Sequence, residues 1–230
     1  HTARPVDNVP DMDLHAHCFC FNTTFDGKEQ RWKAVQFRNI KRDAPYFEAS
    51  FHARLAKRLA TLGYDLERKG RNWDIGGVND ATKAKFSRRT QVIEAAAQEG
   101  GVIRPEDKEK LATKTREAKQ SSLSMDELRE IWLSRLDDGE RRMISKLGQN
   151  QVPSLKSETI EQTVNNARHH CFERSSVVPT RKLATEALQR GLGQVDVANT
   201  LQAIERSDLI EREWRGRKMV TSPEVVAEEE

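Results

Sequence analysis

The residues best suited to chemistry are two histidines near the N-terminus, His15 and His17, in the stretch Leu14–Asn22, Leu-His-Ala-His-Cys-Phe-Cys-Phe-Asn. Side chains of a β-strand alternate between faces at a rise of about 3.3 Å per residue, so two imidazoles in a strand would share one face with roughly 6.6 Å between their Cα atoms. That spacing favours two ligands of one metal ion. A reactive metal centre usually takes three protein ligands, so the site needs a third.

Cys18 and Cys20 belong to the same stretch, and strand alternation places them on the face opposite the histidines. Two residues apart on one strand, they are poorly placed for a disulfide, and the total of three cysteines agrees with a reducing compartment. We expect Cys18, Cys20 and Cys171 to be small buried apolar residues. A soft-metal role for Cys18 and Cys20 is the alternative.

The composition predicts small cores, because 36% of the 230 residues are hydrophobic and 33% are charged. The net charge of +3 and the pI of about 8.8 permit an anionic partner without requiring one. No apolar run approaches the ~18 residues of a membrane span, and no leader peptide is recognisable. We expect a cytoplasmic protein, and a start on histidine suggests a fragment.

The pattern of apolar, turn-forming and capping residues predicts the strands and helices that could position the histidines. Residues 1–13 predict a loop, Leu14–Phe25 a strand, Asp26-Gly27 a hairpin turn, and Arg31–Phe37 the returning strand. A helix should begin near Asp43, with an apolar stripe at Phe47, Phe51, Leu55, Leu59 and Leu62. A second hairpin is expected at Tyr64–Gly76 and a helix at 80–98.

The remaining chain is charged and helical in its first part. Residues 105–120 indicate an exposed helix or linker, and Ser124-Met125-Asp126-Glu127 is a capping box that opens another helix. Helices are then predicted at 158–173, 181–190 and 196–206, followed by a hairpin of Leu209–Trp214 and Lys218–Thr221. Three short helices followed by a β-hairpin are typical of a winged-helix unit.

With these motifs in view, the chain resembles a MobF-type conjugative relaxase of the TrwC/TraI family. The hallmark histidine-triad strand, Leu-His-x-His with a later Asn, is matched by Leu14, His15, His17 and Asn22. The similarity continues through Arg31–Ala34, Leu62–Tyr64, Trp73–Gly77, Lys85–Arg89 and Thr115–Lys119, and in the C-terminal part through Gly191–Gly193 and Thr221–Glu224. The resemblance therefore covers nearly the whole chain.

The resemblance implies a third metal ligand upstream of the pair, in a His-x-x-x-Arg context. His1-Thr2-Ala3-Arg4 is the segment assigned to that position, with two residues rather than three between its His and its Arg. His1, His15 and His17 would then hold a divalent ion. The family implies Mg²⁺ or Mn²⁺, whereas an all-imidazole site would favour Zn²⁺, Ni²⁺ or Mn²⁺. The spacing from His1 to His15 is longer than the resemblance implies, with the Asp7–Asp13 loop absorbing the difference.

The implied reaction is a transesterification, in which a tyrosine hydroxyl attacks a scissile phosphate of single-stranded or hairpin DNA at a transfer origin. In the family the nucleophilic tyrosines lie near the native N-terminus, so we expect no catalytic nucleophile in this chain. Tyr46 and Tyr64 fit structural places. Relaxosome proteins are further implied partners, and no Gly-x-x-x-x-Gly-Lys-Ser/Thr motif for a helicase is present.

Two basic clusters could contact DNA. Lys83, Lys85, Arg88 and Arg89 surround Phe86, and Arg215 and Arg217 would make the wing basic. Each cluster has a structural alternative, a solvated helix face in the first case and a packing module in the second. A non-catalytic DNA-binding or helicase-loading module is the alternative function.

The predicted fold is α+β, an antiparallel sheet with flanking helices like an N-terminally truncated HUH-relaxase palm. The expected domains are a partial relaxase-like domain at 1–100, a helical connector at 101–150, a winged-helix-like unit at 151–224 and a tail at 225–230. The metal-binding strand would lie near the centre of the sheet.

Overall fold

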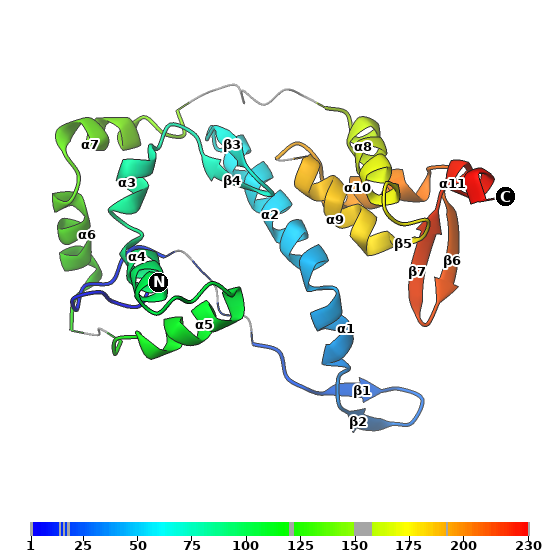
Figure 1. Ribbon diagram of the computed structural model, residues 1–230, viewed down its shortest axis with the longest axis horizontal. Helices are drawn as coiled ribbons and strands as arrows, with labels where there is room; N and C mark the ends of the chain where they lie inside the picture. Colours follow the sequence, from blue (N-terminus) through cyan, green and yellow to red (C-terminus); the bar gives the residue numbers. More distant parts are fainter. Residues whose placement is uncertain are drawn as a thin grey trace. The chain divides into compact units, whose positions relative to one another are not determined.

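The computed structural model describes residues 2–13, 15, 17, 19–119, 122–149, 158–191 and 193–229 (Figure 1). These residues form small antiparallel sheets and many helices, so the α+β class is confirmed. They divide into two compact units, and each consists of two separate stretches of sequence. The predicted domain boundaries at 100 and 150 stay a prediction. Within the described part of the chain, no helix is both long and apolar enough to cross a membrane.

The first unit comprises residues 1–20 and 77–146. Its helices are α3 (Asp80–Ala84), α4 (Arg88–Glu99), α5 (Pro105–Lys114), α6 (Met125–Ser134) and α7 (Asp138–Ser145). The Ser124–Glu127 capping box is present, and a second capping box, Asp137 with Glu140, opens α7. The single helix expected at 80–98 is broken at residues 85–87, since Asn79 caps α3 and α4 has a separate N-terminus.

The described residues 2–13 of the first unit form a tight loop, as predicted. Isolated bridges pair Thr2 with Met12 and Val6 with Val9, and Asp7 and Asn8 between them have φ of +53° and +62°. Positive φ at both central residues is the type I′ hairpin turn, and Asp and Asn tolerate it better than other side chains. The predicted loop at 1–13 is therefore ordered over its described residues.

The strand predicted at Leu14–Phe25 is wrong over the described residues, because β1 covers only Thr24–Asp26 and neither His15 nor His17 lies in a strand. An extended segment becomes a strand only when a neighbour pairs with its backbone, and the pairing of this hairpin begins at Thr24, opposite Lys33. The returning strand is also short: β2 spans Arg31–Lys33. Cys20 is exposed, contrary to expectation, whereas Cys171 is buried as expected; Leu14 and Cys18 lie outside the described residues.

The second unit comprises residues 21–76 and 147–230. Its first stretch holds the β1–β2 hairpin, α1 (Phe37–Arg42), α2 (Ala44–Thr61) and the hairpin of β3 (Leu66–Lys69) and β4 (Asn72–Ile75). Its second stretch holds α8 (Ile160–Phe172), β5 (Val178–Pro179), α9 (Thr180–Arg190), α10 (Val197–Glu205), β6 (Ile210–Trp214), β7 (Arg217–Thr221) and α11 (Pro223–Glu229). The second hairpin and the three helices of the C-terminal stretch agree with prediction.

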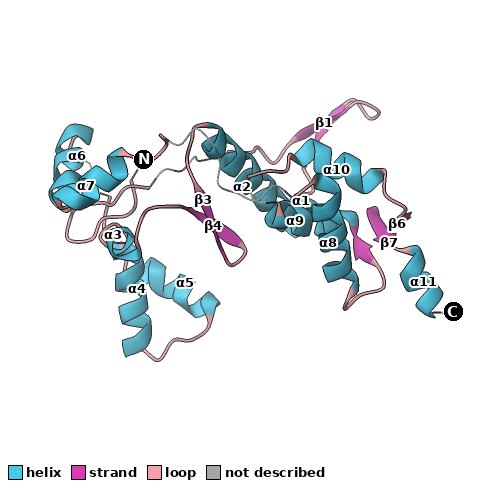
Figure 2. Ribbon diagram, turned by 90° about the horizontal axis from the view of Figure 1, so that it is seen from above, coloured by secondary structure: helices cyan, strands magenta, loops and turns pink. Residues whose placement is uncertain are grey.

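The core of the second unit lies among α8, α9, α10 and a small sheet of order β5-β7-β6, which Figure 2 shows grouped together. Leu183 of α9 is fully buried there, with Val178 and Val220 from the sheet. Helix α2 packs on α9 through Ala49 and Ala53.

The apolar stripe expected on α2 forms only a small part of its buried face, through Leu59, which packs against Ala56 and Leu66. Phe47, Phe51 and Leu62 are 44%, 60% and 58% exposed, while small residues of the same helix, Ala49 and Ala56 among them, are buried. Small side chains let two helix backbones approach closely. The alanine face of α2 is therefore the one that packs against α9.

Candidate metal centre and nucleic-acid contacts

The imidazoles of His15 and His17 lie together, with 3.2 Å between their Nε2 atoms and 4.8 Å between ring centroids. Two nitrogen ligands at 2.0–2.1 Å from a tetrahedral ion would be about 3.3 Å apart. This separation is that of a direct hydrogen bond between the two nitrogens, and it is also compatible with two ligands of one shared metal ion. The pair is not held in a strand.

His15 is oriented by Asp13. Its Nδ1 lies 3.0 Å from the Asp13 carbonyl oxygen and 3.4 Å from the Asp13 carboxylate. A proton on Nδ1 would be donated to these oxygens and leave the Nε2 lone pair directed at the site, as metal-binding histidines usually require. The side chain of His15 is 34% exposed and His17 is exposed, so an ion could reach both from solvent.

The third ligand predicted from sequence, His1, lies outside the described residues. No group of three or more His, Cys, Asp or Glu side chains suited to a metal ion occurs in the part of the chain that the structure describes. The two-imidazole pair is thus the described portion of the predicted site, and the ligand set stays a prediction.

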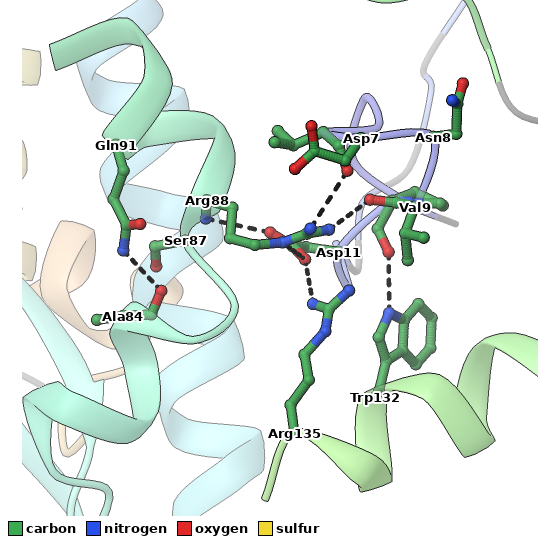
Figure 3. Close-up of polar contacts among 12 residues, drawn as sticks. Asp7, Asn8, Val9, Asp11, Ala84, Ser87, Arg88, Gln91, Trp132 and Arg135 are labelled. Carbon is green, nitrogen blue, oxygen red and sulfur yellow. Dashed lines mark hydrogen bonds and ion pairs between the residues drawn. The ribbon is translucent and has the colours of Figure 1, made fainter. Parts of the chain in front are cut away.

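The loop that leads into the histidines is fixed by Asp11, whose buried carboxylate accepts hydrogen bonds from two helices (Figure 3). The Arg88 Nε and backbone N–H donate to it at 3.0 and 3.1 Å, and Arg135 Nη1 donates at 2.6 Å. The bond to the Arg88 N–H places a carboxylate at the first turn of α4, where the helix dipole favours negative charge.

Further bonds hold the same loop from other sides. The Arg88 guanidinium also donates to the carbonyls of Val6 and Val9, and Trp132 Nε1 donates to the Pro10 carbonyl at 2.9 Å. The Glu117 carboxylate accepts from the backbone N–H groups of Asp7 and Asn8 at 3.0 and 3.1 Å. Sequence reasoning missed Asp11 and Arg135, because nothing in a lone aspartate of a loop indicates two arginine partners far along the chain.

The four cations of the first predicted DNA-binding cluster are engaged inside the first unit. Arg88 holds Asp11, and the Arg89 guanidinium donates to the carbonyls of Ala112 and Thr115 at the end of α5. Lys85 pairs with Glu140 at 2.6 Å, and Lys83 lies 3.6 Å from Asp80. The Arg89 and Lys85 contacts join α4 to α5 and α3 to α7, whereas the Lys83 contact lies within α3. Arg88, Arg89 and Lys85 therefore stabilise the packing of the first unit whether or not they contact DNA.

Glu140 is the buried acid of that arrangement. The Lys85 ammonium, together with hydrogen bonds from the Asp137 backbone and the Thr82 hydroxyl, lowers the pKa of Glu140 to about 2. Glu140 is therefore ionised at neutral pH and links α7 to α3.

Arg215 and Arg217 of the second unit lie at the turn between β6 and β7. The Arg215 guanidinium stacks 4.5 Å from the exposed Trp214 ring, while Arg217 lies 3.9 Å from the Asp43 carboxylate. The two predicted wing residues therefore face different surroundings.

A family model described as TrwC relaxase matches residues 1–138, which is more than half of the chain. No curated protein and no solved structure matches.

Proposed function

The chain belongs to the TrwC relaxase family, and from that premise we propose that it is part of a DNA relaxase that nicks and rejoins one strand at a conjugative transfer origin. At the level of the family the activity is that of a nicking transesterase acting on single-stranded DNA. The proposal adds that a divalent metal ion assists a tyrosine nucleophile. The observation that carries it is the 3.2 Å approach of the His15 and His17 Nε2 atoms inside the matched region.

In this proposal His15 and His17 hold the ion with His1 as the third ligand. Mg²⁺ or Mn²⁺ is the first choice, and Zn²⁺ or Ni²⁺ suits the imidazole donors as well. When bound, such an ion would polarise the phosphoryl oxygens of the scissile group. The chain's own contribution is to orient the His15 imidazole through Asp13 and to anchor the preceding loop through Asp11.

The proposal assigns the nucleophile to a tyrosine outside these 230 residues. Two contacts support it. The Tyr46 ring lies under the Arg181 guanidinium at 5.5 Å, and the Tyr64 ring lies close beside Gly148, so both tyrosines of the chain serve packing.

We further propose that residues 151–224 form a winged-helix unit, argued from its described residues 158–191 and 193–224. The element order α8, β5, α9, α10, β6, β7 with sheet order β5-β7-β6 supports this assignment. It also favours the second candidate function, a non-catalytic DNA-binding or helicase-loading module, in which Arg215 and Trp214 at the β6–β7 turn meet DNA.

Calorimetric titration of Mn²⁺ tests the proposed metal site. We expect the chain to bind Mn²⁺ and the His15→Ala/His17→Ala variant to lose that binding. The matched control is His169→Ala/His170→Ala, which removes two exposed histidines of α8. Equal binding by the chain and the His15/His17 variant would reject the site, and a control that also loses binding would mean that imidazole content alone matters.

A further inference from the structure

Two adjoining hollows of about 620 and 570 Å³ lie in the second unit at the starts of α2 and α9 and along β7. Both are lined by Arg42, Asp43, Tyr46, Pro179, Arg181 and Arg217. We call the second of them, with its own lining residues, the basic hollow. Its volume falls in the range of pockets that hold small ligands, so it could admit part of a single polymer strand but not a double helix.

Positive charge dominates the basic hollow. Six cationic side chains line it, against the carboxylates of Asp43 and Glu186: Arg42, Arg71, Arg174, Arg181, Lys182 and Arg217. They come from α1, the β3–β4 turn, the segment after α8, the start of α9 and the start of β7. A concentration of cations from five separate segments favours an anion with several charges.

Asp43 organises three of these cations. Its buried carboxylate pairs with Arg42 at 3.3 Å, with Arg181, and with Arg217 at 3.9 Å. Burial raises the pKa of Asp43, but the hydrogen bonds and charges of Arg42 and Arg181 outweigh this effect and leave the pKa below its ordinary value. Asp43 therefore stays ionised and positions the guanidinium groups.

The other three cations of the basic hollow are not paired with Asp43. Arg71, Arg174 and Lys182 are exposed, and none of them makes an ion pair with another described residue. Of the two carboxylates, Asp43 is held by arginines, and Glu186 pairs with Arg190 at 2.8 Å. Three accessible cations thus line a hollow whose acids are already neutralised.

Features suited to a nucleic acid lie beside these charges. The Arg181 guanidinium lies 5.5 Å from the Tyr46 ring centroid and 5.4 Å from that of Phe47, and the two rings meet edge to face. Aromatic and guanidinium groups of this kind are those on which bases of single strands stack. At the adjoining wall, α9 begins without a side-chain cap or an acid in its first turn. The buried Thr180 hydroxyl there has no hydrogen-bond partner among the described residues.

The usual contact of a winged helix is less accessible here. Such units insert the N-terminal part of the recognition helix into the major groove. In this chain the corresponding end of α10 is covered by α2, because Lys57 pairs with the Asp196 cap at 3.5 Å and Val197 packs with Ala49 and Ala53. The basic hollow is therefore a better candidate for binding an anion in the second unit than the N-terminal end of α10.

We propose that the basic hollow binds the phosphates of a single DNA strand, with Arg71, Arg174 and Lys182 as direct phosphate contacts and Asp43 as a positioning residue. The inference rests on the proposed function only for the identity of the polyanion, since a relaxase works on one strand. It adds a strand-binding site at a place that the histidine pair does not occupy.

Fluorescence anisotropy with a labelled single-stranded oligonucleotide of mixed sequence, in buffer with EDTA, tests the proposal. The variant Arg71→Ala/Arg174→Ala/Lys182→Ala should bind at least about tenfold more weakly near 0.1 M salt, and its salt slope should fall by about 2, because each phosphate contact to single strands contributes about 0.7. The control Arg54→Ala/Arg58→Ala/Lys146→Ala removes the same charge from exposed positions outside the hollow.

An equal loss of affinity in both triple variants would show a net-charge effect and overturn the proposal, as would unchanged binding by the hollow variant. A duplex probe that binds as tightly through the same three cations would overturn the single-strand assignment. Thermal unfolding of both variants verifies that they fold. Because EDTA removes divalent ions, this outcome is independent of the Mn²⁺ titration, and either proposal can fail alone.

Discussion

The Arg88 guanidinium and the Asp11 carboxylate meet across 77 positions of sequence, with 3.0 Å between Nε and Oδ1. Arg88 belongs to the basic cluster that the sequence assigned to DNA, yet its Nε donates to Asp11, and its Nη1 and Nη2 donate to the loop carbonyls of Val6 and Val9. Replacing Arg88 would therefore disturb the loop that leads into His15 and His17, so a loss of DNA binding in such a variant would not show that Arg88 contacts DNA.

Asp11→Asn should destabilise the first unit. The Asp11 side chain is 4% exposed and faces two guanidinium groups, and removing one partner of a buried ion pair leaves uncompensated charge at a cost of about 3–5 kcal/mol. Urea unfolding followed by Trp132 fluorescence, with the other three tryptophans replaced by phenylalanine, measures it. Asp126→Asn, at an 87% exposed partner of Arg129, should cost less than about 1 kcal/mol. Similar losses in both variants would contradict the structural role of Asp11.

The lowered pKa of Glu140 predicts that the unfolding free energy of the first unit depends on pH in acid. Its pKa is lowered from 4.5 to about 2, so its contribution to stability is fully present above pH 4.5 and is lost as pH falls toward 2. The difference in unfolding free energy between the wild type and Glu140→Gln should be constant above that window and shrink within it. Glu130→Gln, at an exposed position of α6, is the control and should show no such trend. A difference that does not change with pH would reject the Lys85–Glu140 pairing.

Gly191→Ala should destabilise the second unit although the backbone there is not strained. A Cβ at Gly191 would overlap both methyl groups of Val195, which is 1% exposed and cannot move away into solvent. Overpacking of this kind costs about 1–3 kcal/mol. Gly27→Ala is the control, because nothing lies within 4 Å of its added Cβ. The midpoint of thermal unfolding should fall for Gly191→Ala alone, and an unchanged midpoint would contradict the packing.

Local signals in the sequence determined most of the secondary structure. Ser124 with Glu127, Asp196 before α10, and Gly70 with φ of +62° in the β3–β4 turn act through neighbours a few residues away, so pattern alone could locate them. The family was recognisable for the same reason, since its motifs are short and continuous.

Only the tertiary structure decided which surfaces pair. A strand at His15 and His17 needed a partner that their own sequence could not supply, and the small-residue face of α2 became its buried face because α9 packs there. Asp11 met Arg88, and Asp43 met Arg181, through long-range folding. Charge pairing and burial depend on distances between remote segments, and those distances exist only once the chain has folded.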